Sequence, residues 1–249
     1  MTIGTVLLDG TDIRSAGVRL LRGWEGALAV PDLRGDDVTV PDTDGDTWVG
    51  ERPFNAFQVN LPIGLQGGGQ AGFNDARRAL IRLVKPDGLV TATRRLPFGA
   101  GTEDHTASAR YVSGLDPTAM FAMVDGELTL ALKILTGLWY GPSVTISSTG
   151  SVTVLGDVRT RRMTITLTGG TNPTLTNTTT GDSLTWTGTV GGTPIVISNE
   201  TITATQGGTN VSGLLSHTRT YPMTFAAGAN TLALTGGGSF SVAYYPAYL

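Results

Sequence analysis

The sequence predicts a mainly β protein in two parts: a β-barrel-like unit with one α-helix (α+β), followed by an antiparallel β-sandwich. Three observations predict this fold class. The 249 residues include 35 Gly and 12 Pro without a collagen-like period, which indicates many turns. Short apolar stretches alternate with polar residues, as in strands with one buried face. Thr, which favours strands, rises from 13 residues in positions 1–142 to 26 in positions 143–249.

The distribution of charge divides the chain at the same place. Residues 1–142 contain 13 Lys and Arg against 17 Asp and Glu, a net charge of -4. Residues 143–249 contain 4 and 3, a net charge of +1, which together give the -3 of the whole chain. Domains are commonly about 100–200 residues long. We therefore expect two domains, residues 1–141 and residues 142–249.

Several strands are expected in the first part. Apolar runs at 5–8 and 18–21 flank the turn signal Asp9-Gly10 and predict a hairpin or paired strands. Residues 52–63 alternate as a strand does, and Pro53 and Pro62 confine that strand to a sheet edge or to strand ends. Further strands are expected at 89–96, 107–115, 120–124 and 127–135.

One helix is predicted at residues 73–84. Apolar residues recur there every three or four positions, and charged residues occupy the other face. Asn74 is suited to cap the start of the helix, and Lys85-Pro86-Asp87-Gly88 ends it.

The second part consists of short strands separated by Gly- and Asn-containing turns, which predicts a sandwich of two antiparallel sheets. The segment 171–181 is expected to form a turn and an edge strand. The other strands are expected at 143–146, 163–167, 184–189, 195–197, 201–204, 230–234 and 239–244.

The composition excludes several classes of function. Without Cys there are no disulfides, thiolate nucleophiles, zinc–thiolate sites or iron–sulfur clusters. A net charge of -3 and a pI near 5.3 disfavour binding to nucleic acid or to anionic membranes. The first ten residues lack the charged and apolar regions of a secretory signal, and no apolar run approaches 18 residues. We therefore expect no membrane association.

The densest polar cluster is the acidic stretch 32–46. Its segment 42–46, Asp-Thr-Asp-Gly-Asp, begins like a calcium-binding EF-hand loop, but Thr47 and Pro53 stand where such a loop needs Gly and Glu. A solvated acidic loop is the expected structure. The tripeptide Arg34-Gly35-Asp36 is too short to predict integrin binding.

The sequence predicts no catalytic, cofactor-binding or metal-binding residues. His105 and His217 are expected on the surface, and Ser216 beside His217 lacks the Gly-x-Ser-x-Gly elbow of a serine hydrolase. The Gly-rich stretch 65–72 lacks the Gly-Lys-Ser/Thr of a phosphate-binding loop. The second part offers only three acidic residues as general acids or bases: Asp157, Asp182 and Glu200.

Aromatic residues of the second part can either stack on sugars or fill the core, and core filling is the expectation for most of them. The candidates are Trp186, Tyr221, Phe225, Tyr244, Tyr245 and Tyr248. Consecutive strand residues point to opposite faces, so the three C-terminal tyrosines cannot all point inward.

The order of these motifs carries a resemblance. In the first part they are Asp32-Leu-Arg-Gly35, Pro41, Asp44-Gly45, the strand at 52–63, the helix ending in Lys-Pro-Asp-Gly88, the strand at 127–135 and Trp139-Tyr-Gly-Pro142. In the second they are Gly156-Asp-Val, Asn172-Pro-Thr-Leu-Thr-Asn177, Thr180-Gly181, Pro222 and Ala227-Gly-Ala-Asn-Thr-Leu232. This arrangement resembles the distal tail proteins (tail-tip hub or minor tail proteins) of long-tailed, non-contractile bacteriophages.

The resemblance implies a structural virion protein with a belt domain and a galectin-like sandwich. Six copies of the belt domain would form a homo-hexameric ring at the phage tail tip, after assembly in the host cytoplasm. The ring would join the tail-tube protein to the tail-associated baseplate hub protein. Phage DNA would pass through it without specific binding, and no catalysis or cofactor is implied. A belt charge of -4 would repel DNA rather than hold it.

Two alternatives stay open at this point. The first is an adhesin whose sandwich binds a host-surface glycan through exposed aromatic residues. The second is a tail-associated hydrolase that uses Asp42, Asp44 or Asp46 with a metal ion.

Overall fold

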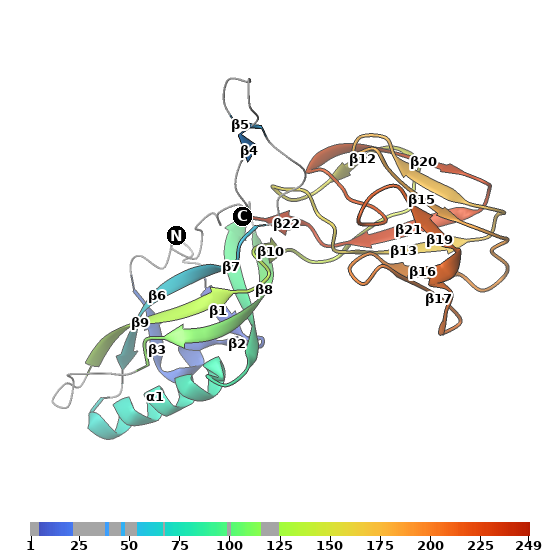
Figure 1. Ribbon diagram of the computed structural model, residues 1–249. Coiled ribbons are helices and arrows are strands. Elements are labelled where there is room, and N and C mark those ends of the chain that lie inside the picture. Colours follow the sequence, from blue (N-terminus) through green and yellow to red (C-terminus); the bar gives the residue numbers. More distant parts are fainter. Residues whose placement is uncertain are drawn as a thin grey trace. The chain divides into compact units, whose positions relative to one another are not determined.

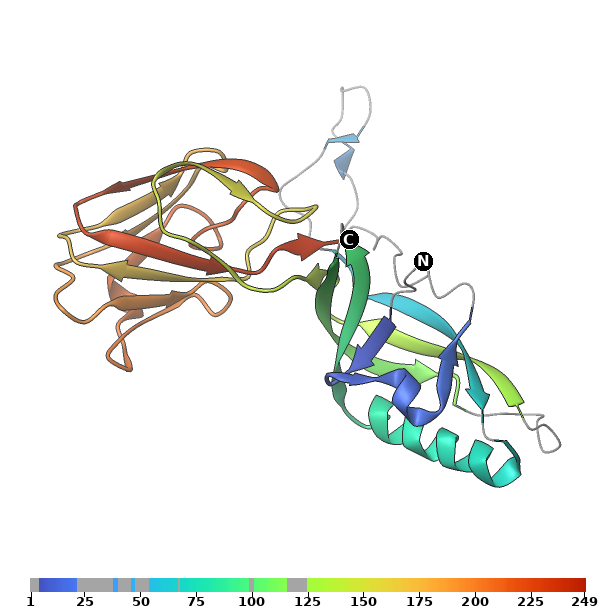
Figure 2. The same ribbon diagram turned by 180° about the vertical axis from the view of Figure 1, so that it is seen from behind.

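The computed structural model describes residues 5–21, 38–39, 46–47, 54–66, 68–98, 101–115 and 125–249 (Figures 1 and 2). Contacts divide the chain into two compact units, Met1–Trp139 with Leu249, and Tyr140–Tyr248. The described residues form one α-helix and many strands, so the mainly β class is confirmed. The first unit ends at Trp139, two residues before the domain boundary expected at residue 141. That each part folds as an independent domain stays a prediction.

The first unit is a curled antiparallel sheet with the order β2-β1-β7-β8-β9-β6-β3. Its edge strands, β2 and β3, are joined by the 3-10 helix η1 (Ile13–Ala16). Four residues at about 2 Å each span little distance, so the sheet must curl until its edges approach each other. Figure 2 shows η1 at this junction. The strands are β1 (Thr5–Leu8), β2 (Thr11–Asp12), β3 (Val18–Leu20), β6 (Phe57–Gln66), β7 (Leu89–Phe98), β8 (Gly101–Ser113) and β9 (Asp125–Ile134); β4 (Val38–Thr39) and β5 (Asp46–Thr47) pair separately.

The core of this unit lies between the sheet and the helix α1 (Gln70–Val84). Val59, Leu61 and Ile63 of β6 are buried, as the sequence pattern predicted, and Leu65 continues the same buried face. The helix contacts β6 and η1 and buries Phe73, Ala76, Leu80 and Val84. The spacing of these four residues creates the single apolar face expected of a surface helix.

The predicted end of the helix at Val84 is confirmed, but its start and its cap are wrong. The helix begins at Gln70, so Asn74 lies within it. Gly69, at φ 148, precedes the first turn, and its main-chain O accepts a hydrogen bond from Phe73 N at 2.9 Å. Few residues other than Gly adopt this backbone conformation, which accounts for the early start.

Strand pairing differs from the sequence-based expectation at two places. The run at 18–21 does not pair with β1, because η1 separates them; β1 pairs with β2 and β7, and β3 pairs with β6. The segment 97–106, which separates the strands predicted at 89–96 and 107–115, lies mostly in β7 and β8, which pair as far as Phe98 and Gly101. The strand expected at 120–124 lies outside the described residues.

The strand that contains Pro62 is not at the sheet edge, because β6 lies between β9 and β3. In an antiparallel pair, the N and O atoms of one residue point to the same side. The main-chain O of Pro62 accepts from Leu21 N at 2.9 Å, so the missing N–H points away from β9. Pro62 therefore removes no hydrogen bond from the β6–β9 ladder.

The second unit contains two antiparallel sheets, as predicted. One has the order β11-β21-β13-β16-β17-β18 and the other β12-β20-β14-β15-β19. The strand β14 (Thr174–Asn177) pairs with both β15 and β20, so its expected edge position is wrong. The remaining elements are β10 (Trp139–Tyr140), β11 (Val144–Ile146), β12 (Gly150–Val154), β13 (Met163–Thr168), β15 (Asp182–Trp186), β16 (Ile195–Ser198), β17 (Thr203–Gln206), β18 (Thr209–Asn210), η3 (Ser212–Leu214), β19 (Leu215–His217), β20 (Gly228–Thr235), β21 (Ser239–Tyr244) and β22 (Ala247–Tyr248).

A polar contact joins the β1–β2 turn to the end of α1 in the first unit. Asp9, at φ 48, accepts a hydrogen bond from Thr91 N at 2.7 Å and forms an ion pair with Lys85 Nζ at 2.5 Å. The hydrogen bond from Lys85, followed by that from Thr91, lowers the pKa of the Asp9 carboxyl. Because the folded pKa lies below the unfolded one, this stabilisation is present above about pH 4 and disappears as the pH falls through the folded value.

We expect Asp9→Asn to lower the free energy of unfolding by about 0.5–1 kcal/mol at pH 7, since the ion pair is partly exposed. Asn also tolerates the left-handed backbone, so the loss of stability measures the contribution of the carboxylate charge. Urea unfolding at pH 7 and pH 3 measures it, with the exposed Asp87→Asn as a control. The difference from the wild type should shrink at pH 3; a larger difference there would contradict the assignment.

Candidate functional surfaces and buried polar clusters

His105 is buried on β8, so its expected surface position is wrong. It shares the inner face of the strand with Ala107 and Ala109, although the two residues before it, Glu103 and Asp104, are acidic. The guanidinium of Arg94, itself buried, donates from Nε to His105 Nδ1 at 3.3 Å and lies 4.8 Å from the Trp139 ring centroid.

The geometry around His105 assigns it a structural role. The ring nitrogen Nδ1 accepts the hydrogen bond from Arg94, and the other ring nitrogen is Nε2. That atom lies 3.4 Å from Glu103 Oε1, and Arg94 also donates to the main-chain O of Leu249 at 2.6 Å. These contacts hold β7 and β8 together and leave the ring closed to solvent.

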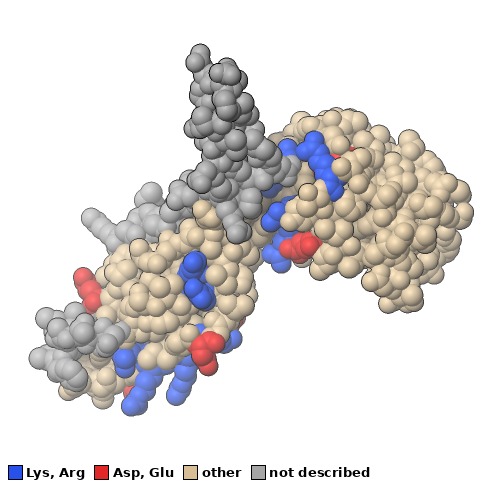
Figure 3. Space-filling view, in the orientation of Figure 1, with Lys and Arg blue, Asp and Glu red and all other residues tan. Residues whose placement is uncertain are grey.

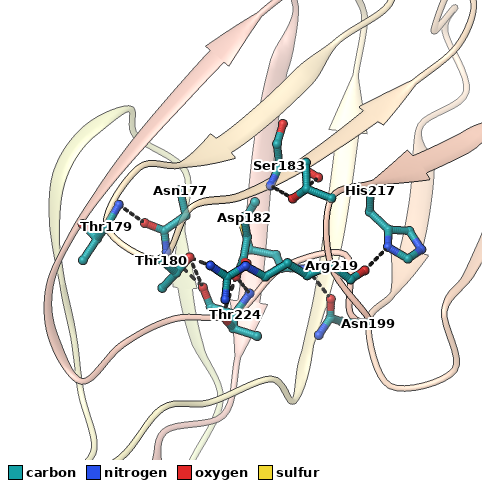
Figure 4. Close-up of polar contacts among 11 residues, drawn as sticks. Asn177, Thr179, Thr180, Asp182, Ser183, Asn199, His217, Arg219 and Thr224 are labelled. Carbon is teal, nitrogen blue, oxygen red and sulfur yellow. Dashed lines mark hydrogen bonds and ion pairs between the residues drawn. The ribbon is translucent and has the colours of Figure 1, made fainter. Parts of the chain in front are cut away.

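The second unit contains a buried carboxylate, Asp182, at the start of β15 (Figure 4). Its side chain is 1% exposed. Oδ2 accepts from Thr180 Oγ1 at 2.9 Å and from both the main-chain N and the hydroxyl of Thr224, at 2.8 and 2.5 Å. Arg219 Nε lies 3.1 Å from Oδ1. Asp182 is therefore neutralised and enclosed, which excludes it as an acid or base acting on a substrate.

Two buried amides extend this network to the neighbouring strands. Asn177 Nδ2 donates to Thr224 O and to Asn230 Oδ1, each at 2.9 Å. Asn230 Nδ2 donates to Ala226 O at 2.8 Å. The network thus links β14, β15 and β20 to residues 224–226. The sequence did not identify these residues as a network.

The other histidine and the remaining acidic candidates do not form a catalytic group. His217 is half-buried on β19, and its Nδ1 donates to the main-chain O of Arg219. Ser216, the preceding residue of that strand, points to the opposite face. Asp157 is exposed, and Glu200 is exposed 3.8 Å from Arg162 Nε.

No group of three or more metal-ligating residues occurs in the described part of the chain. The acidic stretch 32–46, with Asp42 and Asp44, lies outside it apart from the backbone of three residues: Val38, Thr39 and Asp46. Likewise, none of the described helices is long and apolar enough to cross a membrane.

The aromatic candidates divide into core and surface residues. Trp186, Phe225 and Tyr244 are buried, and the rings of the last two meet edge to face with centroids 5.6 Å apart. Tyr245 and Tyr248 are half-buried, which confirms that not all three C-terminal tyrosines face inward. Core filling therefore accounts for the largest rings.

Two arginines stack on tyrosines in the second unit. Arg161 lies 4.6 Å from the centroid of Tyr221, and Arg162 lies 5.0 Å from that of Tyr140 and 4.6 Å from that of Tyr245. Burial raises the pKa of the Tyr140 hydroxyl. We call these five residues the arginine–tyrosine cluster. The run of basic residues at 159–162 was the available sequence signal for it.

The outward faces of the two sandwich sheets are neutral. Cross-strand hydroxyl pairs link Thr174 to Thr185 at 3.0 Å and Thr176 to Ser183 at 3.2 Å. In Figure 3 the visible face of this unit carries few charged side chains. The charged chemistry of the described second unit is thus concentrated at a few positions.

Comparison with known proteins was informative only at the level of structure. No protein-family model matches the chain, and no curated protein matches it. The crystal structure of the Dit protein (gp 19.1) of phage SPP1 matches with a TM-score of 0.71 and 17% identity, over 100% of both chains. The chain has the fold of a distal tail protein. That SPP1 protein is described as a paradigm of the hub adsorption apparatus in phages that infect Gram-positive bacteria.

Two structures of the phage P2 baseplate in its activated conformation, with Ca and with Sr, also match. Their TM-scores are 0.49 and 0.48, with 10% identity over 98% of both chains. The resemblance noted from the sequence motifs is thus confirmed as a likeness of fold to SPP1 Dit that includes both units. The galectin-like character of the sandwich stays a prediction.

We expect Asp182→Ala to lower the free energy of unfolding of the sandwich by about 3–5 kcal/mol, because it leaves Thr180, Thr224 and Arg219 without their shared acceptor. Arg219→Gln should cost about 1 kcal/mol, since Arg219 is half exposed and Asp182 keeps three donors. Urea unfolding of both variants tests this order. Equal losses would show that the ion pair, and not the threonine hydrogen bonds, dominates.

Proposed function

We propose that this chain is a structural subunit of a siphophage tail tip and forms a ring, most simply a homo-hexamer, around the DNA channel. The observation that carries the proposal is the likeness to SPP1 Dit over the whole length of both chains. The ring joins the tail-tube protein to the baseplate hub protein in the virion, after assembly in the host cytoplasm. Phage DNA passes through without specific binding.

The first unit has features suited to ring formation. Identical copies close into a ring only when two different patches of the same chain are complementary. The β7–β8 hairpin pairs with the described residues of β1 as far as Arg95 and continues to Phe98 and Gly101. Arg95 and Asp104 stiffen it with two hydrogen bonds of 2.6 and 2.7 Å. This hairpin is our candidate for one side of the interface between copies.

The proposal is non-enzymatic. Two buried groups that could transfer a proton are both closed to a substrate: His105 lies beside buried Arg94, and Asp182 is enclosed by Thr180, Thr224 and Arg219. Their geometry supports a structural role for both groups.

The glycan-binding alternative has less support. Trp186, Phe225 and Tyr244 are buried, and Arg162 stacks on the ring of Tyr245. Flat, open aromatic faces are what sugar stacking needs. Of the six candidates, therefore, three are withdrawn from solvent, and Tyr221 and Tyr245 each have a ring face occupied by an arginine.

We expect the purified chain to form closed rings of about six copies at micromolar concentration in about 0.15 M salt, measured by mass photometry and negative-stain imaging. Labelling of intact virions with an antibody against the chain should mark the tail tip. Particles without an annular form, both alone and within virions, would overturn the proposal.

A further inference from the structure

The basic residues of the second unit are unusually concentrated. Three of the four Lys and Arg residues in positions 143–249 lie within four positions: Arg159, Arg161 and Arg162. The first part of the chain has the complementary feature, because residues 32–46 contain six Asp and a single Arg. Two segments of one chain therefore carry dense charge of opposite sign.

The arginine–tyrosine cluster presents its guanidinium groups in fixed planes. Arg162 stacks on Tyr140 and Tyr245, and Arg161 stacks on Tyr221. Stacking occupies the faces of a guanidinium and leaves its N–H edge free to bind a carboxylate with two hydrogen bonds. Arg161 is exposed, so its edge is accessible to a partner.

One hydrogen-bond donor of the cluster lacks an acceptor among the described residues. Arg162 Nε is a buried atom without a hydrogen-bond partner among the described residues. The carboxylate paired with it, Glu200 Oε2, is 3.8 Å away, beyond hydrogen-bond distance. A buried donor without an acceptor is unfavourable, so an additional acceptor at this atom would be stabilising.

The backbone under the cluster is held firmly. The buried side chain of Asn199 donates to Arg161 O at 2.6 Å and accepts from Met223 N at 2.9 Å. Tyr245 N donates to Arg162 O at 3.0 Å. A platform that is already ordered loses little conformational entropy when a ligand binds.

We propose that the arginine–tyrosine cluster binds the aspartate-rich segment 32–46 of a second copy of this chain. Carboxylates are the natural partners of paired guanidinium groups, and closely spaced aspartates can engage both arginines. The segment and the cluster are different patches of one chain, which is the arrangement that ring closure requires. The inference rests on the proposed ring and specifies one of its contacts.

Reversal of charge tests the contact. We expect Arg161→Glu to weaken self-association at least about tenfold, and Asp36→Lys with Asp37→Lys to weaken it similarly. The substitution Arg161→Glu leaves the contact with Asn199 intact, because Asn199 donates only to the main-chain O of residue 161. Combining all three substitutions in one chain should restore part of the affinity. The control Arg78→Glu makes the same charge change on exposed α1.

Mass photometry across a concentration series at about 0.1 and 0.5 M salt measures these affinities. The wild type should weaken more than Arg161→Glu as salt rises, because salt screens the contact that this variant lacks. Strictly additive losses in the combined chain would overturn the inference, as would an Arg161→Glu chain that assembles like Arg78→Glu.

Disulfide trapping identifies the occupant, since the chain has no Cys of its own. A mixture of Thr43→Cys and Glu200→Cys chains should form linked pairs on oxidation, because Glu200 lies beside Arg162. The control Ser151→Cys, exposed on β12, should not link to Thr43→Cys. A chain carrying both Thr43→Cys and Glu200→Cys that links only within itself would overturn the second copy as occupant.

The two proposals fail in different ways. Wild-type rings that are insensitive to Arg161→Glu and give no links between residues 43 and 200 would overturn this inference and leave the ring standing. A wild-type chain that is annular neither alone nor in virions would overturn the ring itself.

Discussion

The structure depends on burying one face of each sheet without the help of disulfide cross-links. The chain has no Cys, so packing and hydrogen bonds carry the stability of both units. Along β13, buried Met163, Ile165 and Leu167 alternate with Thr164 and Thr166 on the outer face. In strands that alternate in this way, half of the residues are committed to the core and the other half are small and polar. The exposed arginine Arg161 lies outside such a strand, in the segment that precedes β13.

Among the described residues, each unit buries one charged side chain, Arg94 in the first and Asp182 in the second. Asp182 connects β15 to residues 219–224, and Arg94 connects β7 to β8 and to Trp139. A buried charge is costly unless it is paired and hydrogen-bonded, so these groups favour the single arrangement that satisfies them. They specify how strands are joined, and an apolar core of equal volume would not do so.

The pattern of apolar residues predicted the strand β9 and the end of α1 within about two residues. Such elements are predictable because their buried residues recur at a regular spacing in the sequence. Pairing between distant strands leaves no such pattern: β1 pairs with β7 rather than with the nearby β3. Burial of His105 was hidden by its acidic neighbours. The arginine–tyrosine cluster joins Tyr140, Arg162 and Tyr245, so only the folded chain brings its members together.

Charge gives the two parts of the chain different tasks. A likeness of fold at 17% identity leaves the surface free to differ, so the contacts between copies must be argued from this chain's own residues. An excess of carboxylates in the first part disfavours binding of DNA phosphates in a channel. The same carboxylates are good ligands for guanidinium groups in the second part. In the contact that we propose, the acidic segment holds a neighbouring copy that presents arginine in fixed planes, as Arg161 and Arg162 do.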